Sequence, residues 1–126
     1  MPRRSIEISS FRHANPIPTA SRVGPLLVSS VIAPRDPEGG GTPDGVDAQL
    51  VNLFHHVGEM LAAANADWRH IVKMNFYVGD LSVREAINRP WLEHFPDPAS
   101  RPARHTQVRS AEGRAVSCDF MAYVDD

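Results

Sequence analysis

The chain has 126 residues, 42% of them hydrophobic and 22% charged, which is an ordinary globular composition and leaves no room for a second core. A formal net charge of −2 argues against a nucleic-acid partner, and no apolar run reaches the ~20 residues of a membrane span. The single cysteine, Cys118, excludes an internal disulfide framework. We therefore expect one domain over residues 1–126 in the cytoplasm, without a membrane partner.

The first part of the chain is expected to form strands. Polar and apolar residues alternate over Ser5–Ser9, which predicts a short half-buried strand. Ser21–Val23 and Leu26–Ser29 flank the turn pair Gly24-Pro25 and predict a β-hairpin. The proline, glycine and aspartate content of Pro34–Gly45 predicts a loop after it.

A helical period begins after this loop. Apolar residues recur at three- and four-residue steps from Val46 to Ala64 and predict one helix with a single apolar stripe. Asp44 is the expected N-cap, and Asn65 is the residue expected to end the helix. His55 and His56 lie beside the stripe, and we interpret them as exposed or helix-packing residues.

The strongest predicted strand is Ile71–Val78, in which successive side chains point to opposite faces. Residues 72, 74, 76 and 78 would share the core face, and residues 71, 73, 75 and 77 the other. Ser82 and Glu85 form the pattern of a capping box for a second helix. That helix would direct Leu92 toward the core and be disturbed at Pro90.

Two strands are predicted to end the chain, at about Arg104–Arg109 and Ala115–Val124, joined by a turn at Ala111–Gly113. The result is an α+β fold with a sheet of about six strands and two helices. Two helices can cover one face of such a sheet. The other face, which includes Tyr77, would be too apolar for open water, so we expect it to form an oligomer interface.

Few residues carry an obvious chemical signal. The six histidines are scattered and the cysteine is single, so we expect no metal site. Arg104 and His105 follow a proline-rich loop, and an arginine fork suits either a substrate carboxylate or a salt bridge. Asp119 in mid-strand either pairs with an arginine or belongs to a site with a tuned pKa. Cys118 falls on the apolar face and is expected to be buried and inert.

The order and spacing of several segments resemble the RidA/YjgF family of enamine and imine deaminases over nearly the whole chain. These segments are Asn15 through Gly24, Leu26 through Ser30, Ala62 through Ala66, Ile71 through Leu81, Ile87-Asn88, His94-Phe95, Arg101 through Arg104 and the final strand. The resemblance implies a chorismate-mutase-like fold, a homotrimer with sites between subunits, and neither a metal nor an organic cofactor. It also implies hydrolysis of 2-imino or 2-enamino acids to 2-keto acids and ammonia.

The resemblance also implies roles for individual residues. Arg104 matches the family arginine that holds the substrate carboxylate, and Asp119 falls where the family has a glutamate that positions the attacking water. Ser29 and Ser30 match a serine-glycine pair near the ligand. Asn88 matches an asparagine of the second helix, with a structural or catalytic role.

The chain departs from the family pattern at several of these positions. Ile17 stands where a tyrosine commonly lies beside the substrate, Thr106 replaces a frequent cysteine, and Asp119 is one methylene shorter than glutamate. His105 and Trp91 are not typical of the family, and we expect His105 to line the substrate site. The alternative is a protein that binds a small carboxylate or a protein partner without turnover. A ribonuclease activity, also attributed to the family, is disfavoured by the net charge.

Overall fold

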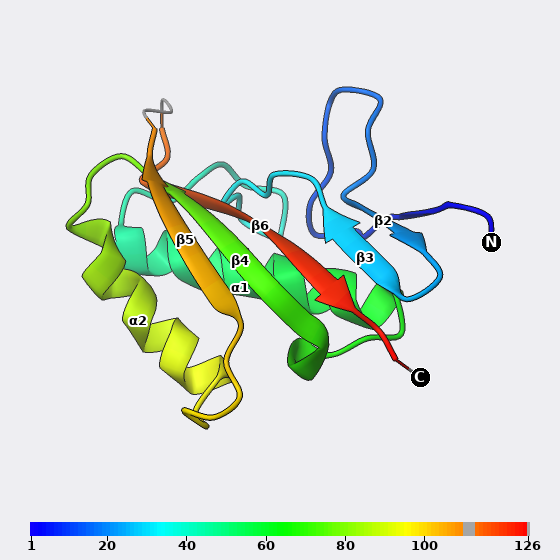
Figure 1. Ribbon diagram of the computed structural model, residues 1–126. Coiled ribbons are helices and arrows are strands. Elements are labelled where there is room, and N and C mark those ends of the chain that lie inside the picture. The colour runs from blue at the N-terminus through cyan, green and yellow to red at the C-terminus, as the bar shows by residue number, and fades with distance from the viewer. Residues whose placement is uncertain (110–112, 126) are drawn as a thin grey trace.

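A computed structural model describes residues 1–109 and 113–125 of the chain. One sheet holds its strands in the order β1-β2-β3-β6-β4-β5. The strands are β1 (Arg4–Ile6), β2 (Ala20–Val23), β3 (Leu26–Ser29), β4 (Ile71–Val78), β5 (Ala103–Val108) and β6 (Val116–Tyr123). Neighbouring strands are antiparallel except β4 and β5, which are parallel (Figure 1). The predicted six-stranded mixed sheet is therefore confirmed.

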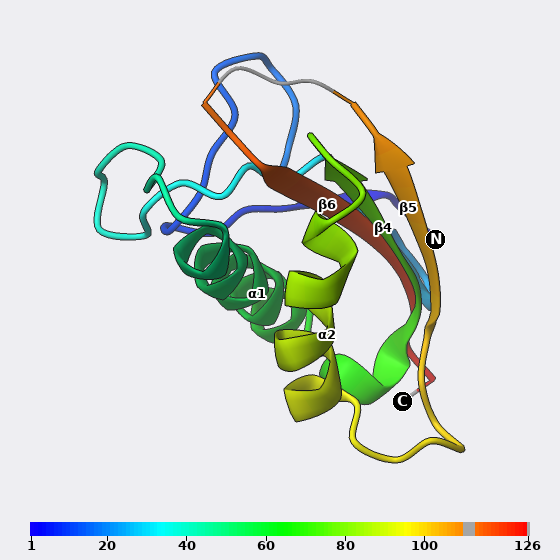
Figure 2. The same ribbon diagram turned by 90° about the vertical axis from the view of Figure 1, so that its left-hand side faces the viewer.

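Two α-helices, α1 (Val46–Ala63) and α2 (Val83–His94), pack on the same face of this sheet, and a short 3-10 helix, η1 (Trp68–His70), precedes β4 (Figure 2). The core lies between the helices and the sheet. Its largest fully buried side chains include Leu53, Val57, Met74, Phe76, Ile87 and Phe120. The opposite face of the sheet is left uncovered by the described part of the chain (Figure 2). Among the described residues, no helix is long and apolar enough to cross a membrane.

The predicted stripe of α1 is confirmed, but the helix begins differently from the prediction. Gly45, not Asp44, is the N-cap, and no side chain accepts a capping hydrogen bond there. The predicted end is confirmed, because Asn65 adopts a left-handed φ of 57° just past the helix. The amides of Asn65 and Ala66 donate to the carbonyls of Ala62 and Leu61 over 3.1 and 2.8 Å, which is the Schellman pattern.

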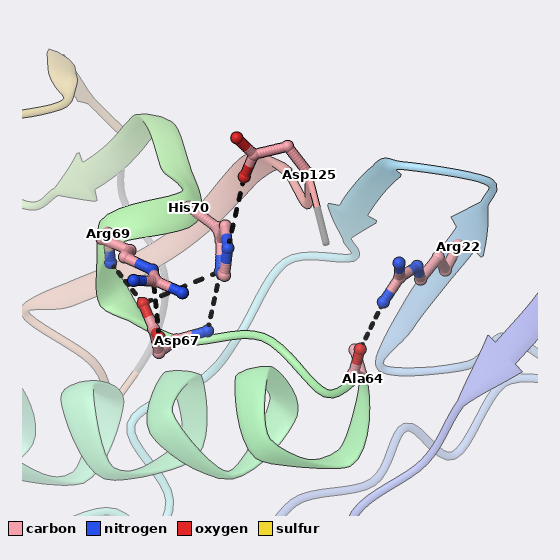
Figure 3. A network of polar contacts seen from close by, with 6 residues as sticks. All are labelled: Arg22, Ala64, Asp67, Arg69, His70 and Asp125. Atoms are coloured by element: carbon pink, nitrogen blue, oxygen red, sulfur yellow. Dashed lines mark hydrogen bonds and ion pairs between the residues drawn. The ribbon is translucent and has the colours of Figure 1, made fainter.

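Polar contacts fasten the end of α1 to the sheet (Figure 3). Arg22 of β2 donates from Nη1 to the carbonyl of Ala64, one of the groups that a helix end leaves without an intrahelical partner. Beyond it, the amide of Asp67 donates to Nδ1 of His70 over 3.0 Å. Nε2 of His70 lies 3.6 Å from a carboxylate oxygen of Asp125. These contacts tie the end of α1 to β2, and η1 to the C-terminal segment.

Two core predictions are wrong, because strand pairing and helix packing decide which side chains are buried. A register irregularity between Ile71 and Lys73 leaves Val72 54% exposed and turns Ile71 into the core. In α2, Leu92 is 50% exposed and Trp91 is buried instead. Trp91 lies four residues after the buried Ile87 and therefore shares its face of the helix. Leu92, the next residue, is rotated by about 100° from Trp91 around the helix axis.

Two further predictions need correction. Strand β1 ends at Ile6, the last residue that pairs with β2. The Ser82–Glu85 capping box does not form, and Asp80 instead accepts from the amide of Ser82 over 2.8 Å. Helix α2 runs to His94 and contains Pro90. Residues 111 and 112 of the predicted turn lie outside the described residues.

Candidate functional site

The alternation of side chains in β4 separates the predicted site residues. Met74 points into the core, and Asn75 therefore points to the open face of the sheet. Arg104 pairs with Met74, so it shares the helix-covered face. Asn75 pairs with Asp119 on one side and His105 on the other, so these three side chains form a row across the open face. Within one chain, Arg104 and Asp119 therefore lie on opposite faces.

Arg104 lies at the edge of the sheet against α2. Its guanidinium carbon is 5.1 Å from the ring centroid of Trp91, within the range of a cation–π contact. It lines a groove of about 550 Å³ together with Leu81, Ser82, Arg84, Glu85 and Asn88. Partial burial, and then the charge of Arg84, lower the pKa of Arg104 from its usual value. A bound anion would offset both effects.

None of the ion pairs found among the described residues includes Arg104. Among the described residues, its fork contacts the ring of Trp91 and forms no ion pair with a carboxylate. The fork is therefore available to a carboxylate from outside the described part of the chain. Asn88 shares this groove, whereas Ile17, Ser29, Ser30, His105 and Asp119 do not line it.

Asp119 is held at both carboxylate oxygens. Nδ2 of Asn75 donates to Oδ1 over 2.7 Å, and the hydroxyl of Tyr77 donates to Oδ2 over 2.6 Å. Burial, and then the hydrogen bond to Asp119, raise the pKa of Tyr77 to about 12. The guanidinium of Arg109 lies 4.8 Å from the ring centroid of Tyr77. The carboxylate is thus fixed by two donors from β4, the strand that pairs with β6.

Ser29, Ser30 and Ile17 form a third group, at the end of the β2–β3 hairpin. Oγ of Ser29 accepts from the amide of Phe120 over 2.9 Å, which places it beside the strand segment that carries Asp119. Ser30 donates from Oγ to the carbonyl of Pro18 over 2.8 Å and so steadies the segment that carries Ile17. Ile17 itself is exposed. The hydroxyl of Ser29 thus binds the backbone of β6, and that of Ser30 binds the segment before β2.

The sequence reasoning missed Asn75 and Tyr77 as partners of Asp119. The alternation in residues 71–78 placed both side chains on the non-core face, which was the available signal. The missing information was the register between β4 and β6, which pairs Asn75 with Asp119. Cys118 is fully buried, as predicted, and burial raises the pKa of its thiol. No cluster of three metal-ligating side chains occurs among the described residues.

The fold and these polar groups define a class of protein: a small α+β sheet protein with an arginine groove on one face and a fixed carboxylate on the other. Residues 8–119 match the sequence profile of the family described as Endoribonuclease L-PSP. The chain therefore belongs to this family, as the resemblance to RidA and YjgF proteins predicted. The match covers most of the chain and includes every predicted site residue.

Individual proteins place the chain within the family. It is 30% identical over 83 residues to a RutC family protein of Aquifex aeolicus, covering 66% of each chain. It is 29% identical over 81 residues to Reactive Intermediate Deaminase A, chloroplastic, of Arabidopsis thaliana, covering 64% of this chain and 42% of that protein. Its fold superimposes on E. coli TdcF, solved with bound serine, with a TM-score of 0.86 and 21% identity over 97% of this chain and 99% of that one.

Proposed function

We propose that this protein hydrolyses 2-imino acids, or the 2-enamino acids from which they form, to 2-keto acids and ammonia. The observation that carries the proposal is Arg104, whose partly buried guanidinium lines an open groove without a carboxylate partner among the described residues. A planar fork of this kind binds a carboxylate through two parallel hydrogen bonds. The deaminase name of the Arabidopsis relative and the serine bound to TdcF agree with an amino-acid-like ligand.

The proposed reaction uses the residues in separate roles. Arg104 binds the substrate carboxylate, and Asp119 orients a water molecule toward the imine carbon and accepts its proton as the C–O bond forms. The electrons of the C=N bond move to nitrogen, which takes up the proton held by Asp119 and gives a carbinolamine. The hydroxyl of this intermediate then loses its proton, the nitrogen gains one, and the C–N bond breaks as the C=O bond forms, so that ammonia leaves. A pathway-specific enamine would tautomerise to its imine before this step.

The proposal needs two chains for each site. Because Arg104 and Asp119 lie on opposite faces of one sheet, a cleft that contains both must take one residue from each of two subunits. The open face carries exposed apolar side chains suited to such contacts, among them Leu26, Val28, Met121 and Tyr123. We therefore propose a homotrimer with three sites between subunits, as the family resemblance implies.

The direct test is turnover of imines made in place. Amino-acid oxidases generate a panel of 2-imino acids, semicarbazide traps the imine that remains, and the loss of the trapped product reports hydrolysis. We expect the protein to accelerate imine loss and Arg104→Ala to abolish the acceleration. Normal activity in that variant, or no acceleration with any imine or with larger enamines, would contradict the proposal.

A second candidate is a protein that binds a carboxylate without turning it over. The exposed Ile17, which cannot donate a hydrogen bond where the family resemblance implies a tyrosine, favours this alternative. It predicts binding of 2-ketobutyrate or serine, measured by calorimetry and lost in Arg104→Ala, with no imine turnover. The two candidates thus share the binding result and differ in the semicarbazide assay.

A further inference from the structure

Asp119 is fixed from the same strand at both of its oxygens. Asn75 and Tyr77 lie two residues apart in β4, so both side chains project from the open face toward β6. Their hydrogen bonds to Oδ1 and Oδ2 measure 2.7 and 2.6 Å, at the short end of the range for such bonds. β4 is itself held between β5 and β6, so the two donors have little freedom to move.

We propose that Asn75 and Tyr77 are positioning residues, which set the direction of the Asp119 carboxylate toward the attacking water. The inference rests on the proposed hydrolysis and adds two residues to it that neither the family pattern nor the comparisons assign. Neither residue touches the substrate in this account. Both act through Asp119.

The hydrogen-bonding capacity of the carboxylate is consistent with this role. An ionised carboxylate offers about four lone-pair sites, two on each oxygen. Asn75 and Tyr77 occupy one site on each oxygen, which leaves one on each for a water molecule. The donors therefore fix the plane of the carboxylate without exhausting its capacity to accept from water.

Tyr77 is well suited to remain a donor. With a pKa of about 12, its hydroxyl stays protonated throughout the neutral and mildly alkaline range. The guanidinium of Arg109 over its ring restrains the ring orientation. Asn75 donates from an amide, which does not titrate. The geometry of Asp119 should thus be insensitive to pH wherever Asp119 itself is ionised.

The arrangement also accounts for aspartate at position 119. Aspartate has one rotatable bond fewer than glutamate, and its carboxylate reaches Asn75 and Tyr77 directly across the strand pair. A glutamate would carry the carboxylate past these donors by about one ångström, a displacement that can cost on the order of 100-fold in rate. Asp119→Glu, although it restores the residue that the family resemblance implies, is therefore expected to lower kcat.

A double-mutant cycle tests the inference in the full-length protein. Tyr77→Phe is expected to lower kcat for imine hydrolysis by about tenfold, the effect of one lost hydrogen bond to a charged group, with KM unchanged. In an Asp119→Ala background, the same change is expected to cost less than about twofold, because Tyr77 acts through Asp119. Equal losses in both backgrounds, or a change confined to KM, would overturn the positioning role.

A second measurement does not depend on activity. Tyr77 and Tyr123 are the two tyrosines of the chain, so the ultraviolet absorbance titration of a Tyr123→Phe variant reports Tyr77 alone. Adding Asp119→Ala should move that titration down from about 12 toward the ordinary tyrosine value, since two of the causes of the raised pKa are removed. An unmoved titration would refute the contact and the inference, whatever the enzymatic result. A moved titration in a protein that hydrolyses no imine would refute the proposed function but retain the contact.

Discussion

Arg104 and Asp119 lie on opposite faces of a single sheet, because Arg104 pairs with Met74 and Asp119 pairs with the next residue, Asn75. A one-residue difference in a strand reverses the direction of the side chain. If both residues serve one reaction, each site must join two chains. This requirement leads to a test that neither residue alone could offer.

We predict that two impaired variants restore activity in each other. Arg104→Ala should be inactive as a pure protein, and Asp119→Ala should keep only a measurable residual rate, lower than that of the wild type by about 100-fold or more. When the two are unfolded together and refolded at equal concentrations, mixed trimers should contain some sites with Arg104 from one chain and Asp119 from another. About a quarter of the wild-type activity should return, as expected for random mixing around a threefold axis. Mixing the folded proteins without exchange is the control, and no recovery after verified exchange would contradict a shared site.

The shape of the arginine fork should matter as well as its charge. Arg104→Lys retains a positive charge but loses the bidentate geometry and the stacking of a planar group on Trp91. We expect KM for a 2-imino acid to rise by about tenfold or more, the loss of one charge-assisted hydrogen bond. Arg89→Lys, at an exposed position of α2 outside the groove, is the matched control and should leave KM unchanged. An equal effect of both substitutions would exclude a specific role for the fork.

A glycine in the middle of α1 should be replaceable with a gain in stability. A Cβ at Gly58 would meet its nearest neighbour, Cζ2 of Trp68, at 3.5 Å, which is ordinary van der Waals contact. Gly58→Ala should therefore stabilise the fold by about 0.5–1 kcal/mol, because alanine loses less backbone entropy in a helix. Chemical denaturation measures the difference.

Gly24 is the matched control for that substitution. Its φ of +54° lies in the left-handed region, and an added Cβ would approach Sδ of Met1 to 2.5 Å. Gly24→Ala should therefore lower the free energy of unfolding by about 1 kcal/mol or more. If both substitutions changed the free energy of unfolding in the same direction, the backbone conformation at these two glycines would not explain the effects.

His56 should make the stability depend on pH. It is fully buried, donates from Nε2 to the carbonyl of Arg35 over 2.7 Å, and contacts Oγ of Ser10 at 3.0 Å. Burial is the largest cause of its lowered pKa; the charges of His55 and Arg35 also lower it, and the hydrogen bond to Arg35 and the charge of Glu59 oppose the shift. The folded state therefore binds fewer protons than the unfolded state below about pH 6.5, and stability falls as the pH drops through that value.

Chemical denaturation at pH 8 and at pH 5 tests the direction of this pH dependence. The free energy of unfolding of the wild type should decrease toward pH 5, and the decrease should be smaller in His56→Gln, which cannot titrate but can still form hydrogen bonds. The neighbouring His55 is exposed and acts on His56 only through its charge, so His55→Gln should change the pH dependence less than His56→Gln does. If the free energy of unfolding decreased more in His56→Gln than in the wild type, His56 would not be the cause of the pH dependence.

Local patterns in the sequence predicted most of the elements of the fold. The hairpin, the stripe of α1 and the strand Ile71–Val78 follow from turn residues and from periods of two and about 3.6, which depend on near neighbours in the chain. The errors occur where a distant partner decides the outcome. The register shift beside Lys73 reverses Val72, and packing of Trp91 against Phe76 and Phe95 takes the core position predicted for Leu92.

The sequence by itself determined the fold class, the family and the identity of Arg104 and Asp119 as residues of interest. The tertiary structure alone decided that these residues lie on opposite faces and that Asn75 and Tyr77 bind Asp119. The reason is physical: alternation along one strand sets which residues share a face, but the register between strands distant in the sequence sets which of them meet. β4 and β6 are separated by α2 and β5, and no local pattern in either strand specifies how they align.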